Sequence, residues 1–259
     1  MRRGKRAGTA STPVAEYVPH QSHAVQRKPE ASALSAPLAR TVPETGFAES
    51  RSPASVPDAA RPGRIAQLDW PALRQEIQLC RACSLCAERQ QAVPGVGAEE
   101  ADWLFVGEGP GAEEDERGEP FVGQAGRLLD AMLSAINIRR GEDVYIANAV
   151  KCRPPGNRTP EASEMAACRP YLERQIMLLQ PRLIVLLGRA AVHSLLGLDA
   201  SLSSLRGKPL SYRLGELEIP VVVTYHPAYL LRNLPDKSKA WEDLCRARAL
   251  MKTAKSAGA

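Results

Sequence analysis

The stretch WLFVGEGPGAEEDERGEPF, from Trp103 to Phe121, decides how the rest of the chain is interpreted. It begins with a short apolar run that lacks a helical period, Trp103–Val106, and this run stops at the glycine-rich segment Gly107–Gly111. Such a pattern predicts a buried strand that ends in a turn. Glycines there let the backbone approach a ligand closely and present its N–H groups. The segment matches neither GxGxxG nor a Gly-Lys-Ser/Thr phosphate loop, so it predicts a ligand site without identifying the ligand.

Three further apolar runs continue the strand pattern, at residues 144–147, 183–187 and 221–224. Helical patterns alternate with them, including 123–136, which is apolar on one face, and 159–179, which Thr159 is expected to cap. Strands that alternate with helices predict a largely parallel sheet covered on both faces. We therefore expect an α/β fold, a three-layer α/β/α sandwich with a central, mostly parallel four-stranded sheet. A hairpin is expected around residues 214–215.

Functional side chains in such folds lie beyond the carboxyl ends of the strands. The glycine-rich segment follows the first strand, Asn148 follows the second, and His226 follows the fourth. Because the carboxyl ends of parallel strands meet at one edge of the sheet, these segments are expected to converge on a single site.

The composition indicates a soluble domain with a basic end. The chain has 259 residues, 44% of them hydrophobic, and contains no apolar stretch long enough to span a membrane. Residues 1–66 contain 10 Lys or Arg and 5 Asp or Glu, which accounts for the whole net charge of +5. This segment is rich in Ala, Pro, Ser and Arg, so we expect a disordered arm that contacts DNA or a repair or replication partner. The ordered domain is expected at 67–252, with Asp69 capping its first helix, and residues 253–259 are expected to be disordered.

The basic start is compatible with an organelle transit peptide, but we favour the solvated arm. No apolar segment follows residues 1–6, so a secretory signal is not expected. The body of the chain is neutral, which neither requires nor excludes nucleic-acid binding.

Five cysteines form two groups with metal-ligand spacing. Cys80 and Cys83 form a CxxC pair that Cys86 extends, and Cys152 and Cys168 lie far downstream. Four thiolates from two regions suit either tetrahedral zinc or an iron–sulfur cluster, and the spacing does not choose between them.

Four motifs, taken in order, resemble those of family 4 uracil-DNA glycosylases, the iron–sulfur branch of that superfamily. They are GEGPG at 107–111, PFVG at 120–123, NAVKCRPP at 148–155 and HPAYLLR at 226–232. The resemblance covers about residues 76–251. It implies hydrolysis of the N-glycosidic bond of deoxyuridine in DNA, which leaves an abasic site in the base excision repair of deaminated cytosine.

The resemblance also implies a cofactor and a setting. A structural [4Fe–4S] cluster would be held by Cys80, Cys83, Cys152 and Cys168, with Cys86 as a spare. The partner would be uracil-containing DNA, single- or double-stranded. No association with a membrane is expected. We expect a monomer that is cytoplasmic, nucleoid-associated and of bacterial type.

A glycosylase must flip its base out of the stack into a pocket that reads the polar edge of the base. In the resemblance, Phe121 is the stacking platform, and the Asn148 amide donates to uracil O4 and accepts from N3–H. His226 would donate to O2 and stabilise charge on the departing uracil anion. Gly107 and Gly109 would belong to the same substrate-binding loop.

The sequence does not decide which residue orients the attacking water. Related families carry an acidic or amide side chain at the position of Gly109, so Glu108 is the first candidate and Glu114 the second. Alternatively, a positioned water and a dissociative transition state need no strong base. Glu114 is also a candidate for excluding the thymine methyl group, because Gly111 has no side chain to do so.

Contacts with DNA outside the pocket are expected from the HPAYLLR segment. Leu231 is the candidate for a wedge that fills the space of the flipped base, and Arg232 the candidate for a phosphate contact. Leu230 is expected to pack on the core. Lys151, Arg153 and Arg158 are further candidates for phosphate contacts.

Two other interpretations explain less. A zinc-stabilised nucleic-acid-binding module would account for the cysteines but not for Asn148 and His226 at separate strand ends. The heme-associated, covalently trapping relative of the family has a loop similar to GEQPG and carries a histidine in a basic insertion. Here residue 109 is Gly, and residues 156–167 contain no histidine.

Overall fold

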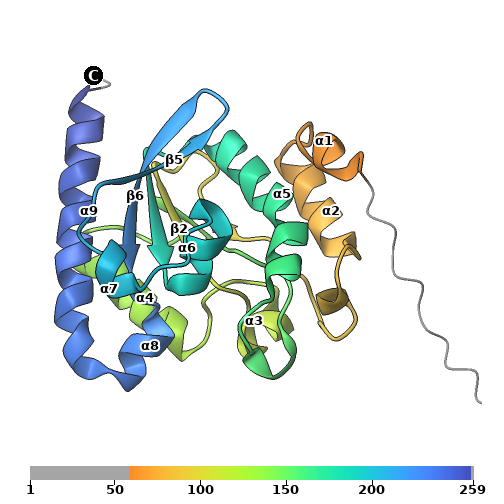
Figure 1. The fold of residues 1–259 in the computed structure, drawn as a ribbon, viewed down its shortest axis with the longest axis horizontal. Helices are drawn as coiled ribbons and strands as arrows, with labels where there is room; N and C mark the ends of the chain where they lie inside the picture. The colour runs from red at the N-terminus through yellow and green to blue at the C-terminus, as the bar shows by residue number, and fades with distance from the viewer. Residues whose placement is uncertain (1–58, 258–259) are drawn as a thin grey trace, which may run out of the picture. The chain divides into compact units, whose positions relative to one another are not determined.

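The computed structural model describes residues 59–257, so residues 1–58 of the arm expected at 1–66 lie outside the described residues (Figure 1). The predicted domain start at residue 67 is wrong, because Arg61–Ile65 form helix α1. Ile65 is fully buried, and Arg61 donates a hydrogen bond to the Ala167 carbonyl at 2.8 Å. The predicted disorder of residues 253–257 is also wrong, because helix α9 runs over Lys237–Ala257.

Within the described residues, the sheet has six strands in the order β1-β3-β2-β4-β6-β5. The four central strands are parallel, as predicted: β3 (Val144–Asn148), β2 (Trp103–Gly107), β4 (Leu183–Leu187) and β6 (Leu217–Thr224). Two antiparallel edge strands, β1 (Val96–Gly97) and β5 (Leu210–Leu214), raise the expected count from four to six. The β5–β6 hairpin turns at Gly215, whose φ of 57° suits glycine, in agreement with the predicted turn.

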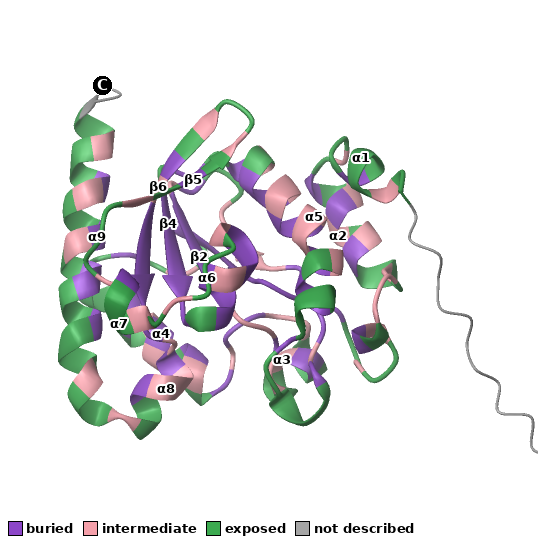
Figure 2. Ribbon diagram, viewed as in Figure 1, coloured by how far each residue is buried: buried purple, intermediate pink, exposed green. Residues whose placement is uncertain are grey.

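Helices cover both faces of the sheet, which confirms the three-layer sandwich (Figure 1). Helices α2 (Trp70–Leu79), α5 (Ala162–Leu179) and α6 (Arg189–Leu196) pack on one face, with α1. Helices α4 (Gln124–Ala135), α8 (Pro227–Arg232) and α9 pack on the other. In β2, Leu104 and Val106 face the first layer and Trp103 and Phe105 face the second. Burial on both sides explains why the inner parts of the four central strands are continuously apolar; these parts are purple in Figure 2, whereas the β5–β6 hairpin is partly green and pink.

Short elements complete the described chain: helices α3 (Ala112–Arg117) and α7 (Leu202–Leu205), and 3₁₀ turns η1 (Ser84–Cys86), η2 (Pro155–Asn157) and η3 (Leu234–Asp236). Among the described helices, none has the length and apolar character needed to cross a membrane.

The two predicted helix caps had different outcomes. Asp69 caps α2 as predicted, because its carboxylate accepts from the Ala72 N–H at 3.0 Å. The prediction of Thr159 as the cap of α5 is wrong. Glu161 is the cap, and Glu164 accepts from the Glu161 N–H at 2.8 Å in a capping box. Thr159 therefore stays in the loop that precedes α5, where it lines the candidate site.

Strand register aligns the segments that carry the motifs. Gly107 pairs with Asn148 at the ends of β2 and β3, and Leu187 pairs with Thr224 at the ends of β4 and β6. The Gly188 N–H donates to the Thr224 carbonyl at 2.9 Å, which holds the second pair of strand ends together. The glycine-rich loop, Asn148 and His226 thus leave the sheet along one edge.

Candidate active site

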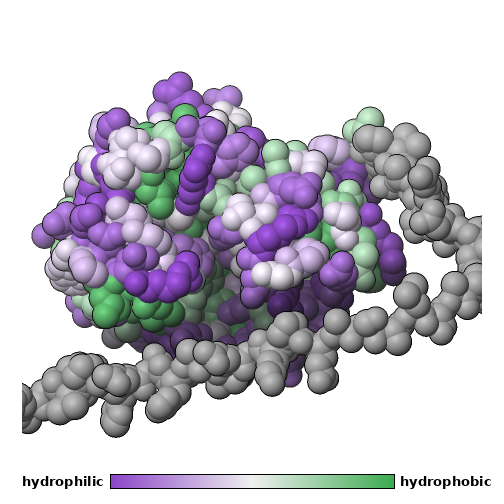
Figure 3. All heavy atoms as spheres, turned by 60° about the horizontal axis from the view of Figure 1, so that its bottom comes forward, coloured by the Kyte–Doolittle hydropathy of each residue, from purple (hydrophilic) through white to green (hydrophobic). Residues whose placement is uncertain are grey.

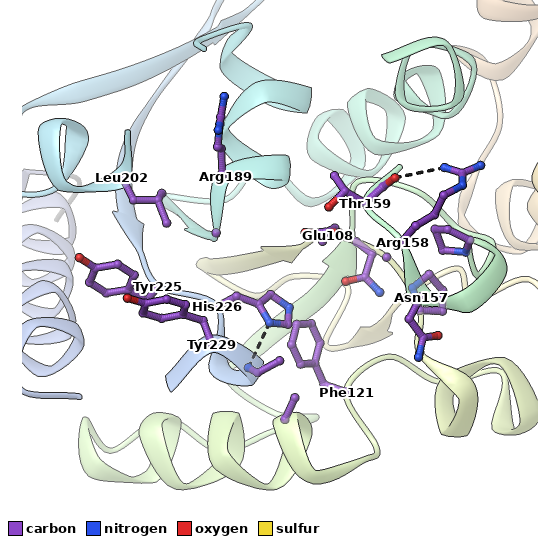
Figure 4. Close-up of a pocket in the computed structure, with 18 of the residues that line it drawn as sticks. Glu108, Phe121, Asn157, Arg158, Thr159, Arg189, Leu202, Tyr225, His226 and Tyr229 are labelled. Atoms are coloured by element: carbon purple, nitrogen blue, oxygen red, sulfur yellow. Dashed lines mark hydrogen bonds between the residues drawn. The ribbon is translucent and has the colours of Figure 1, made fainter. Parts of the chain in front are cut away.

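A pocket of about 860 Å³ opens at this edge (Figure 4). Its wall includes eight of the residues predicted from sequence: Glu108, Gly109, Glu114, Phe121, Asn148, Arg158, His226 and Arg232. Gly107 and Leu231 do not line it. A side chain at Gly107 would collide with Asn148 Oδ1 and come within 2.6 Å of Phe121 Cζ, so glycine there leaves room for both residues.

Asn148 brings an unpaired acceptor to the pocket. The residue is 2% exposed, and its Oδ1 is buried without a hydrogen-bond partner among the described residues. Its backbone is fixed from behind, because Lys151 Nζ donates to the Asn148 carbonyl at 2.8 Å and to Gln175 Oε1 at 2.7 Å. A buried acceptor left unpaired is costly, so this oxygen is suited to a donor on a ligand.

His226 is held as a neutral donor. It caps α8, and its Nδ1 accepts from the Ala228 N–H at 3.2 Å, so the proton of the neutral ring is on Nε2. Burial and, to a smaller extent, the positive charge of Arg232 together lower the pKa of His226 to about 4, against the opposing effect of Glu114. Figure 4 shows the imidazole beside the Phe121 ring, with the ring centroids 5.4 Å apart. The pocket therefore presents an aromatic face and an N–H donor side by side.

Glu108 and Glu114 have different environments. Glu108 is half-buried, and burial raises its pKa, while a hydrogen bond from Thr159 works in the opposite direction. Glu114 accepts from the backbone N–H groups of Gly111, Val122 and Gly123, at 3.1, 3.0 and 3.0 Å. Its carboxylate thus fastens the glycine-rich loop to the segment that carries Phe121. The sequence contains a signal for the bond to the Gly111 N–H alone, since Glu114 is the third residue of α3 and Gly111 is its N-cap.

The residues predicted to contact DNA differ in their exposure and in their partners. Leu230 is 1% exposed and packs in the core as expected, whereas Leu231 is 39% exposed. Arg232 lines the pocket, where its positive charge acts on His226. The predicted phosphate contact of Lys151 is wrong, because this side chain is buried. Arg158 forms an ion pair with Glu164 at 2.6 Å.

Sequence reasoning missed one wall of the pocket. Arg189, Leu202, Tyr225 and Tyr229 line it, together with Ser201 and Ser203 (Figure 4). The Tyr225 and Tyr229 rings stack with their centroids 5.0 Å apart. Residues 200–205 carry no motif, and only the path of the chain from α6 to β5 brings them to the site.

The comparisons with known proteins bear directly on this geometry. A family model described as the uracil DNA glycosylase superfamily matches residues 94–245. A type-4 uracil-DNA glycosylase of Sulfurisphaera tokodaii is 43% identical over 187 residues, which cover 71% of this chain and 85% of the relative. The chain belongs to the type-4 uracil-DNA glycosylase family. The resemblance found in the four motifs is thereby confirmed.

Further type-4 uracil-DNA glycosylases agree. The one from Thermotoga maritima is 44% identical over 181 residues, covering 69% of this chain and 92% of the relative. The one from Archaeoglobus fulgidus is 46% identical over 161 residues, covering 61% and 80%. The protein is a uracil-DNA glycosylase, as expected.

The cluster expected from the type-4 resemblance needs four thiolate ligands. Cys80, Cys83, Cys152 and Cys168 line one small cavity, although three separate parts of the chain supply them. Cys86 does not line it. All four are free thiols, and burial raises the pKa of Cys152 to about 11 and that of Cys168 to about 12. Within the described chain, no three His, Cys, Asp or Glu side chains are arranged as a site for a metal ion.

Cationic and backbone donors surround these sulfurs. Arg89 donates to Cys152 Sγ at 2.9 Å, Arg61 lies 3.7 Å from Cys80 Sγ, and the Lys151 N–H donates to Cys168 Sγ at 3.3 Å. Such donors favour thiolates over neutral thiols and complement an anionic cluster. The donor set therefore fits the cluster that the resemblance implies.

Proposed function

We propose that the protein flips uracil out of DNA into this pocket and hydrolyses its N-glycosidic bond, leaving an abasic site, in the repair of deaminated cytosine. One observation carries the proposal: a buried, unpaired Asn148 Oδ1 lies in the same pocket as the Phe121 ring and a neutral His226. Together they offer what a flipped pyrimidine needs, namely an aromatic face, an acceptor and a donor.

The proposed hydrogen bonds discriminate uracil from cytosine. Uracil N3–H donates to Asn148 Oδ1, and the N–H₂ group of the Asn148 amide donates to uracil O4. Cytosine has an acceptor at N3 and an amino donor at C4. It would therefore leave Asn148 Oδ1 unpaired and place its amino group against the amide N–H₂ of Asn148, which is also a donor. Free rotation of the amide would weaken this discrimination; glycine at position 107 leaves the room that Asn148 Oδ1 occupies.

His226 supports the departure of the base. As the glycosidic bond breaks, negative charge develops on the uracil ring, including O2. A neutral Nε2–H aimed at O2 stabilises that charge without the cost of desolvating a cation. Water attacks the sugar carbon and passes a proton to Glu108, and uracil leaves as an anion with the electron pair of the broken bond.

Glu108 is proposed to orient the attacking water, since it is half-buried in the pocket wall. Replacing Glu108 with glutamine is expected to lower single-turnover excision about 100-fold, in line with the loss of one general base. Affinity for DNA with a non-hydrolysable uracil nucleotide is expected to stay within a factor of two to three of wild type. An unchanged rate would show that a positioned water reacts without a base.

We also propose that Cys80, Cys83, Cys152 and Cys168 hold a [4Fe–4S] cluster with a structural role. When bound, such a cluster supplies cross-linking of the chain rather than a redox step. Its ligands would tie the end of α2 to α5 and to the loop that follows Asn148. This arrangement would make the pocket wall depend on the cluster.

Cys86 provides a matched control for this proposal. Replacing Cys80 with serine is expected to abolish the broad visible absorption of anaerobically purified protein, with loss of iron and of thermal stability. Replacing Cys86 with serine is expected to leave all three unchanged. Zinc in place of iron in the wild-type protein, or equal iron loss in both variants, would overturn the assignment.

The proposed setting follows from the substrate. The protein would act as a monomer on single- or double-stranded DNA, in the cytoplasm near the chromosome, with Leu231 as wedge and Arg232 on phosphate. The exposed surface shown in Figure 3 is largely hydrophilic.

The proposal is tested with oligonucleotides that carry one uracil, opposite guanine or in a single strand. We expect free uracil and an abasic site that breaks only after treatment with alkali. Cytosine and thymine at the same position are expected to remain. Failure to release uracil, or equal release of cytosine, would refute the proposal.

A further inference from the structure

Phe121 has an unusual backbone conformation for an aromatic residue. Its φ is 55°, in the left-handed region that favours glycine. The other described non-glycine residues with positive φ are Asn137, Asn157 and Gln180, all with amide side chains. A bulky residue in this region is strained and persists only where its surroundings hold it there. Because Phe121 lines the pocket, the groups that hold its backbone also set the direction of its ring.

Arg140 supplies one such set of contacts from outside the pocket. Its Nη1 donates to the Phe121 carbonyl at 3.1 Å, and its Nη2 donates to the Pro120 carbonyl. The guanidinium therefore bridges two successive peptide groups, one on each side of the strained φ. A rotation of either peptide would break a charge-assisted hydrogen bond.

Two carboxylates keep the guanidinium itself in place. Arg140 Nη1 lies 3.1 Å from Asp130 Oδ1, and Nη2 lies 3.1 Å from Glu119 Oε1. The Arg140 side chain is only 21% exposed, so these ion pairs are partly shielded from solvent. Arg140 precedes β3, Asp130 lies on α4, and Glu119 precedes the Phe121 turn. The clamp thus connects three elements around one loop.

Gly126 and Glu114 also hold this loop. A side chain at Gly126 would collide with the Phe121 carbonyl, so only glycine permits this approach of α4. Glu114 holds the next two N–H groups, those of Val122 and Gly123. Glu114 itself lines the pocket, whereas Arg140 does not. Arg140 can therefore be altered without removing a group that faces the substrate.

We infer that Arg140 is a positioning residue for uracil excision, which fixes the Phe121 ring beside His226 by clamping the carbonyls of Pro120 and Phe121. The inference rests on the proposed role of Phe121 as the stacking platform for uracil. Arg140 acts through Phe121 and touches neither the base nor the reacting atoms.

Replacing Arg140 with alanine is expected to lower single-turnover excision by about 10- to 100-fold, the effect of a misplaced binding group. Inhibition by free uracil is expected to weaken by a similar factor, while affinity for abasic DNA stays unchanged. Arg140→Lys, which keeps the charge but cannot bridge both carbonyls in the same fork, is expected to recover only part of the rate. If the alanine variant does not fold, the lysine variant carries the test.

Arg139 provides the matched control. It is the adjacent arginine, its side chain is 68% exposed, and it pairs with Glu142 and Asp143. Arg139→Ala is expected to keep wild-type excision.

A double-mutant cycle separates positioning from general destabilisation. In a Phe121→Ala background, Arg140→Ala is expected to cause no further loss of rate. An additive loss, or a wild-type rate for Arg140→Ala, would overturn the inference.

Hydrogen exchange tests the clamp independently of activity. The Val122 and Gly123 amides are expected to exchange faster in Arg140→Ala but not in Arg139→Ala. Unchanged exchange in Arg140→Ala would refute the clamp even if uracil is excised. Conversely, faster exchange in a protein that releases no uracil would place the failure in the proposed function.

Discussion

Replacing Asn148 with leucine is expected to lower single-turnover uracil excision by about 10²- to 10³-fold, the usual cost of removing one preorganised hydrogen-bonding group from a catalytic site. Leucine has nearly the same shape and removes both the donor and the acceptor. The flipped uracil would then be buried with O4 and N3–H unpaired.

The same substitution is expected not to lower thermal stability. Asn148 Oδ1 is buried without a partner among the described residues, so folding gains nothing from this oxygen in the absence of substrate. Rates from quenched-flow or manual mixing under enzyme excess, together with thermal melts, check both halves. A rate within threefold of wild type, or a large loss of stability with a proportionate loss of rate, would contradict the assigned role.

Replacing His226 with leucine is expected to lower the excision rate by a similar factor of about 10²–10³, through loss of the donor to the uracil anion. Affinity for uracil-containing DNA is expected to change much less, because the charge develops only in the transition state. Equal losses in affinity and rate would show that His226 contributes ground-state binding instead.

The pH dependence of stability tests the ionisation state of His226. Its pKa is lowered to about 4, from an ordinary value of 6.5 in the unfolded chain. Between these values the unfolded state binds a proton that the folded state refuses, so the wild-type unfolding free energy should rise with pH across this window. The leucine variant is expected to lack this contribution. Identical slopes for the two proteins between pH 4 and 6.5 would contradict a neutral, buried imidazole.

The sequence predicts the central sheet well because its signal is local. Each central strand is apolar at every position of its core, which is the mark of a strand buried on both faces. The edge strands carry less signal: β1 is two residues long, Val96–Gly97, and forms only by pairing with β3. Composition also misplaces the start of the domain. Contacts with distant parts of the chain fasten α1: Ile65 is buried, and Arg61 donates to the Ala167 carbonyl and lies over the Tyr171 ring.

The candidate site divides in the same way. Asn148, Phe121 and His226 are found from motifs and from the geometry of parallel strands. The long-range hydrogen bonds of Glu114 and Arg140 cannot be predicted in this way. Their partners are backbone N–H and carbonyl groups of a loop that folds back on itself. The burial of Lys151 could not be predicted from the sequence either. A lysine next to cysteine and arginine is expected at the surface, and only the folded chain brings its partners, the Asn148 carbonyl and Gln175, to its ammonium group.

The most direct test of the account is a crystal structure of the protein with uracil and abasic DNA. We expect the uracil ring to stack on Phe121, with N3–H donating to Asn148 Oδ1 and O2 accepting from His226 Nε2. Uracil bound elsewhere in the pocket, or turned so that its polar edge faces away from Asn148, would contradict the account.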